Sequence, residues 1–113
     1  METSILVTIR TMLVGDSTDT SFDTELITFI NNSFFNLYQI GVSDDSFVVT
    51  GTTETWNDFL QGKLNFETVK TYVYLKVKLM FDPPSVGGVL DAIKASIAEL
   101  EWRLNLEAEQ RRE

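Results

Sequence analysis

The residues that could do chemistry in this sequence are carboxylates, because the chain contains no histidine and no cysteine. Their absence excludes Ser-His-Asp triads, thiol nucleophiles, disulfide scaffolds and Cys/His zinc sites. Paired carboxylates could exchange protons or hold a cation, and the pairs are Asp16/Asp19, Asp44/Asp45 and Glu99/Glu101. Residues one or two apart on a helix do not share a face, and acids in turns commonly form local hydrogen bonds. We therefore expect no catalytic residue, no cofactor and no metal, and a function carried by surfaces.

The charge of the chain is unevenly distributed. The net charge is −8, and residues 1–62 carry nine acids and one base, Arg10, whereas residues 63–113 carry eight acids and eight bases. An acidic half repels phosphates, which argues against a conventional DNA-binding protein. It is either a solubilising surface or a surface that stays close to DNA without binding it.

Basic and aromatic residues of the second half are candidates for contacts with other proteins. Lys70, Lys76 and Lys78 form either a solvated face or a contact strip for an acidic neighbour, and halves of opposite charge suit head-to-tail association of copies. A tryptophan near the end of a coiled-coil-like helix is usually part of a core, but Trp102 and Arg103 are also of the residue types enriched at interface hot spots. Arg111 and Arg112 either solvate the chain end or pair with a partner's acids.

The elements that position these residues are predicted to be helices of one small domain. The 113 residues, 43% of them apolar, indicate a single domain over 1–113 with a charged tail at 107–113 that either projects from the body or frays. Neither a signal peptide nor a membrane-spanning segment is readable, so synthesis in the cytoplasm is expected.

The first half predicts two helices, a loop and one helical turn. Apolar spacing predicts helices over 4–14 and from 21–23 to 40, each followed by a glycine, Gly15 and Gly41. Residues 42–55 are expected to be an ordered loop, with 47–50 as a possible short strand. Residues 55–60 resemble a single helical turn with Trp56, Phe59 and Leu60 directed inward.

Residues 66–81 have both an alternating and a helical apolar pattern. Their length, about sixteen residues, exceeds that of a usual strand and favours a central helix packed on two sides, with Asn65 as its cap and Asp82-Pro83-Pro84 as its end.

Residues 89–106 predict the longest helix, about 27 Å at 1.5 Å per residue. Gly87-Gly88 is expected to form a flexible joint before this helix. A heptad seam of apolar residues runs along the helix and consists of Val86, Leu90, Ile93, Ile97, Leu100 and Leu104. The fold class predicted is all-α: a bundle of four to five helices with a long carboxy-terminal helix.

Three stretches together resemble the head–tail connector (adaptor) proteins of tailed bacteriophages. They are residues 69–84 (VKTYVYLKVKLMFDPP), residues 99–105 (ELEWRLN) and residues 55–60 (TWNDFL). The resemblance covers residues 55–106 well and the first half in length and helix order only. It also implies that residues 66–81 are helical.

The resemblance implies a function that composition does not give. Such proteins form a ring, expected to be a dodecamer, beneath the portal protein at the capsid vertex. The ring extends the DNA channel without binding DNA specifically, helps to retain the packaged DNA and offers a docking surface to the stopper or tail completion protein. The carboxy-terminal helix and tail would engage the portal, which by position corresponds to 101–113 here.

Two sets of site residues are expected, the interface set from residue types and position and the acids from their clustering in loops. The expected portal or subunit interface consists of Trp102, Arg103, Leu106, Arg111, Arg112, Lys70, Lys76 and Lys78. The loops expected to face the channel or the next ring contain Asp16, Asp19, Asp44 and Asp45. The alternative is a small cytoplasmic helical interaction module that dimerises through the seam from Val86 to Leu104.

Overall fold

The computed structural model describes residues 3–112, and side chains over 3–110. Within these residues the chain forms five helices: α1 (Ile5–Leu13), α2 (Asp23–Gln39), α3 (Trp56–Leu60), α4 (Phe66–Phe81) and α5 (Gly87–Arg112). No strand occurs within residues 3–112, and a single isolated antiparallel bridge there joins Ser4 to Thr55. The prediction of an all-α fold with a long carboxy-terminal helix is confirmed.

Helices α1, α3 and α4 each begin at a side chain that caps the helix. The Ser4 hydroxyl accepts the Val7 N–H at 3.3 Å, and the Asn65 side-chain oxygen accepts the Thr68 N–H at 3.0 Å. At α3, Thr55 accepts the Asp58 N–H at 3.2 Å while the Asp58 carboxylate accepts the Thr55 N–H at 2.8 Å. Each bond satisfies an amide that has no partner inside the helix, so the sequence determines where these helices start.

The ends of α1 and α2 lie at the predicted glycines. Gly15 has a φ of 84° and Gly41 a φ of 88°, a left-handed conformation that costs glycine little. These glycines turn the chain into the two loops that flank α2.

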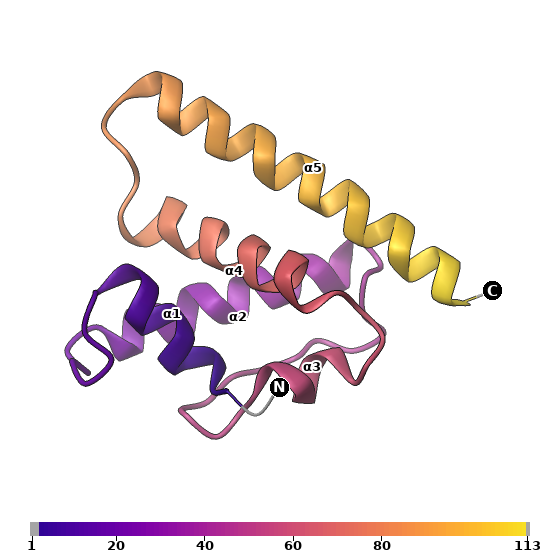
Figure 1. Cartoon of the computed structure of the whole chain (residues 1–113), viewed down its shortest axis with the longest axis horizontal. Coiled ribbons are helices and arrows are strands. Elements are labelled where there is room, and N and C mark those ends of the chain that lie inside the picture. The colour runs from indigo at the N-terminus through magenta and orange to yellow at the C-terminus, as the bar shows by residue number, and fades with distance from the viewer. Residues whose placement is uncertain (1–2, 113) are drawn as a thin grey trace.

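Helix α4 is the centre of the fold. In Figure 1 it runs through the middle of the molecule between α5 and the layer formed by α1 and α2, and its most extensive contacts are with α2 and then with α5. Its residues Val69, Tyr72, Val73 and Val77 are fully buried. The predicted central helix packed on two sides is therefore confirmed, and Glu67 and Thr71 are exposed whereas Lys78 is half-buried.

The possible strand at 47–50 does not form, because a side chain supplies the hydrogen bonds that a neighbouring strand would give. The amide of Asn31 donates to the Val49 carbonyl at 2.9 Å and accepts the Val49 N–H at 2.6 Å. Val49 is thereby held in the core at 1% exposure without a β-ladder. Helix α3 follows, with Trp56 and Leu60 buried and Phe59 half-buried, as predicted.

Helix α5 is longer than predicted. It has 26 residues, about 39 Å at 1.5 Å per residue. Gly87 and Gly88 are its first two residues and not a flexible joint, because the Val86 carbonyl accepts the N–H groups of both Val89 and Leu90 at 3.1 Å.

The heptad seam of α5 packs against the chain's own body. Ile97 and Leu104 are buried and Ile93 and Leu100 are partly buried, whereas Val86 is 62% exposed. A dimer built on this seam would compete with the contact between α4 and α5. Ala108 is also buried, so the first turn of the charged segment 107–112 packs on the body.

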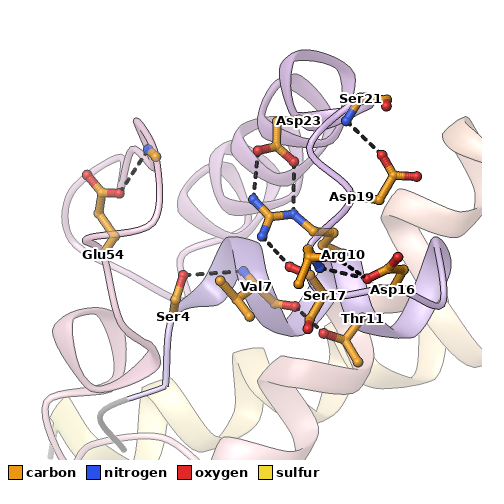
Figure 2. A network of polar contacts seen from close by, with 12 residues as sticks. Ser4, Val7, Arg10, Thr11, Asp16, Ser17, Asp19, Ser21, Asp23 and Glu54 are labelled. Carbon is orange, nitrogen blue, oxygen red and sulfur yellow. Dashed lines mark hydrogen bonds and ion pairs between the residues drawn. The ribbon is translucent and has the colours of Figure 1, made fainter.

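A buried ion pair joins α1 to α2. Arg10 reaches from α1 to Asp23 in the first turn of α2, with contacts of 2.7 Å from Nη2 and 3.0 Å from Nε, and its Nη1 donates to the Ser17 carbonyl at 2.7 Å (Figure 2). The Arg10 side chain is 6% exposed. Its hydrogen bond with Asp23 raises the pKa of Arg10, so the cation is retained despite burial. One guanidinium thus holds α1, the 15–22 loop and α2 together.

We expect Arg10→Ala to lower the free energy of unfolding by about 3 kcal/mol, because it leaves the Asp23 carboxylate without its partner in a largely buried site. Denaturant unfolding measures the change. Glu67→Ala is the matched control: it removes the exposed ion pair with Lys70, in which Glu67 is 70% exposed, and should cost about 1 kcal/mol or less. Equal losses in the two variants would contradict the role assigned to Arg10.

Candidate interaction site

The outward face of α5 carries two exposed apolar side chains. Trp102 is 65% exposed and Leu106 is 40% exposed, and they lie one turn apart. Leu104, two residues after Trp102, points to the opposite side and is fully buried. Since the heptad seam already faces the body, Trp102 does not belong to the core. Of the two interpretations of Trp102 from the sequence, core residue or interface residue, the structure excludes the first.

Of the other expected residues at this end of the chain, Arg103 follows Trp102 directly on α5. Arg103 forms an exposed ion pair with Glu99 at 3.3 Å, and Arg103 and Leu106 both line a shallow hollow beside the start of α4. Arg111 and Arg112 are the last residues of α5, and their side chains lie outside the described part of the structure.

Polar contacts determine which face of α5 turns outward. The hydroxyl of the buried Tyr72 on α4 donates to the Glu101 carboxylate at 2.8 Å. The Asn65 N–H donates to Glu107 at 3.3 Å, and the Asn105 side-chain amide donates to the carbonyl of Ile40 at the end of α2. Burial and then the carboxylate acceptor raise the pKa of Tyr72 above its ordinary 10.0. Rotation of α5 about its axis would break all of these bonds, so Trp102 is held outward.

The lysines of α4 do not form one strip. Lys70 pairs with Glu67 at 3.1 Å and lies over the Phe66 ring, with Nζ 5.0 Å from its centroid. Lys78 pairs with Asp82 at 3.8 Å. Lys76 is half-buried and, by the helical repeat, projects from another side of α4. The three charges are therefore separated, and the charges of Lys70 and Lys78 are partly balanced by neighbours on their own helix.

The acids Asp16 and Asp19 have hydrogen bonds within their own loop. Asp16 accepts the N–H of Thr18 at 2.9 Å and its hydroxyl at 2.7 Å, and Asp19 accepts the Ser21 N–H at 3.0 Å (Figure 2). These bonds lower the pKa of both carboxyls. The same hydrogen bonds close the turns that lead into α2. The two acids therefore determine the conformation of the loop and also give it negative charge.

Asp44 and Asp45 lie at the other end of α2, on the rim of a groove. This acidic groove, of about 650 Å³, lies between the 42–48 loop and residues 58–64. Its apolar lining includes Phe47, Phe59 and Leu64, which we call its floor. The 17 residues of α2 span about 25 Å, so the structure places the four expected acids in two separate groups.

Residues 5–111 match the family of phage connector proteins. The chain belongs to the phage connector family. No curated protein and no solved structure was found to match it. Phage connectors are structural proteins, and this chain is therefore a connector and a component of the virion. Connectors in general associate into homo-oligomers and with portal and tail proteins.

Among residues 3–110 of the connector, no group of three or more acids is arranged to hold a metal ion. None of the helices in the described chain is long and apolar enough to span a membrane.

Two features of this surface were not predicted from the sequence. One is the acidic groove, which needs the 42–48 loop, α3 and Ala108 of α5 to come together. The other is the pair Tyr72–Glu101, 29 residues apart, which turns α5. Tyr72 and Glu101 lie within the stretches that carry the family resemblance, but spacing alone does not show that they meet.

We expect Tyr72 to lower the free energy of unfolding of the connector at alkaline pH. Its pKa is raised in the folded chain, so its contribution is complete below pH 10 and is lost as the pH rises above the unfolded value of 10.0. Each further pH unit costs up to about 1.4 kcal/mol while Tyr72 stays protonated only in the folded state. Denaturant unfolding between pH 8 and 11 should show this component in the wild type and not in Tyr72→Phe. The same loss of stability in both proteins would exclude this origin.

Proposed function

We propose that this connector is a ring-forming adaptor subunit that docks beneath the portal protein, extends the DNA channel and joins the head to the tail. The ring is expected to contain twelve copies to match the portal, and its lower face receives a stopper or tail completion protein. The subunit acts as one domain over 1–113, needs no cofactor and catalyses no reaction. It is made in the cytoplasm of the host and functions in the neck of the virion.

The family match over 5–111 is the observation that carries this proposal. The outward face of α5 adds support, because Trp102 and Leu106 expose apolar surface of the kind that interfaces bury. The interface of the ring or portal would contain these residues with Arg103, Arg111 and Arg112. Lys70, Lys76 and Lys78 would form separate contacts around α4.

The loop acids are proposed to face the channel or the next ring. An acidic lining lets DNA pass because it offers no cation to the phosphates. Asp16 and Asp19 are held by their hydrogen bonds near the start of α2, so their charges have defined positions in the assembly.

Deleting the gene from the phage that encodes it tests the proposed function directly. We expect heads and tails that do not join, with packaged DNA poorly retained, because the part between portal and tail is missing. Plaque counts and electron microscopy of the lysate measure this. A plasmid copy of the gene should restore infectious particles, whereas intact infectious particles without the protein would overturn the proposal.

Charge reversal in the loops tests the role of the acids. With lysine at 16, 19, 44 and 45, DNA passage or tail joining should fail and infectivity should fall at least tenfold, because lysines would bind the phosphates. Asparagine at the same positions is the matched control: it retains an oxygen that can accept the bonds from Thr18 and Ser21 and removes only the charge. Unchanged infectivity with the lysines would contradict the proposed lining.

A further inference from the structure

We propose that the acidic groove of one copy receives Trp102 and Arg103 of a neighbouring copy. This inference rests on the proposed function and names the contact that joins the subunits of the assembly. The partner is a second copy of this chain, and the two contacting surfaces are different parts of it.

The protruding element of this contact is Trp102. It is 65% exposed on a 39 Å helix whose opposite side is buried, and α5 is fixed about its axis by the bonds of Tyr72 and Asn105 described above. A tryptophan on a fixed helix has only two side-chain torsions to order on binding, so it loses little conformational entropy for its contact area. Ala95 and Ala98 precede it as exposed small residues, so a partner's surface can approach the helix closely there.

The receiving element is the acidic groove. Phe47, Phe59 and Leu64 are only half-buried, so part of their surface faces the open groove of about 650 Å³. Phe47 and Phe59 are also packed on Phe34, with ring centroids 5.1 and 4.6 Å away, which fixes the floor. A floor of ring edges and faces is suited to an indole in edge-to-face packing.

Within one chain the two surfaces cannot meet. The side of α5 that reaches the groove is that of Ala108, which lines it, and Trp102 is not among the lining residues. By the helical repeat Trp102 projects about 120° away from Ala108. The occupant must therefore come from another molecule, which makes the contact heterologous. Heterologous contacts close into rings when the rotation between copies allows it.

The charges of the two surfaces are also complementary. The groove has Asp44, Asp45 and Asp58 along its lining against one base, Lys63. Arg103, next to Trp102, is 61% exposed and would bring its guanidinium to this rim. The pairing places Asp44 and Asp45 at the contact between copies in addition to the role proposed above for the loop acids, so lysine at 16 and 19 alone tests the channel lining separately from this contact.

Cross-linking between two variants tests the contact, because the natural chain has no cysteine. Ala98→Cys places a thiol one turn before Trp102, and Ser46→Cys places one in the lining of the groove. We expect a short bismaleimide to link the two variants when they are mixed, and chains carrying both thiols to give a ladder of oligomers. Trp102→Ala in both chains should lower the yield at least tenfold. Val86→Ala, which truncates an apolar residue of similar exposure directly before α5, should leave the yield unchanged.

A charge exchange separates pairing from folding. Arg103→Glu should lower the yield of the 98–46 cross-link at least threefold, and adding Asp44→Lys and Asp45→Lys should restore it. Lys94→Glu, the same charge change elsewhere on α5, should have no effect. Absence of rescue would overturn the pairing of Arg103 with this rim.

The outcomes distinguish this inference from the proposed function. If mass photometry shows large discrete oligomers but the 98–46 cross-link does not form, the inference is overturned and the proposed ring is not. A dominant 98–98 cross-link would indicate a symmetric dimer and overturn it as well. Absence of any cross-link up to millimolar protein also counts against it, and the gene-deletion experiment then decides the proposed function independently.

Discussion

Burial of both sides of α4 is the constraint on which the rest of the structure depends. Val69, Tyr72, Val73 and Val77 are completely inaccessible, and burying an apolar side chain of this kind is worth about 1.5–3 kcal/mol, so this helix contributes much of the stability of the core. Helix α2 supplies one wall with Leu26, Ile30, Phe34 and Leu37, and α5 supplies the other with Ile97 and Leu104. Because α4 needs both walls, the long helix is committed to the body along its seam and must present its other side to solvent.

That commitment explains the surface of the connector. The bonds from Tyr72 and Asn65 to α5, and from Asn105 to the end of α2, are polar and directional, so they determine the rotation of α5 as well as its position. Trp102 and Leu106 are outward as a consequence. An interface residue held in place by the core can bind without first being ordered, which suits a subunit that must fit several neighbours at once.

The acidic loops at the two ends of α2 are similarly tied to the core. Arg10 balances Asp23 and holds the Ser17 carbonyl, so the loop containing Asp16 and Asp19 is anchored by a buried cation (Figure 2). At the other end, Asn31 holds Val49 and thereby the segment that follows Asp44 and Asp45. The proposed contacts of these loops with DNA or with an adjacent ring would need charges that are held in such defined positions.

The sequence by itself determined the local features of this protein. Ser4, Thr55 and Asn65 specify helix starts, and Gly15 and Gly41 specify ends, because capping and left-handed turns depend on residues a few positions apart. Apolar spacing was also enough for the all-α class and for the seam of α5, and the motifs at 55–60, 69–84 and 99–105 were enough for the family. What only the tertiary structure decided were contacts between distant segments: the side of α5 on which Trp102 stands, the partner of Arg10, the amide of Asn31 in place of a strand, and the groove beneath Ala108. A periodic pattern shows which face of a helix is apolar. It does not show how much of that face the rest of the chain covers, because this depends on where the neighbouring helices end in space.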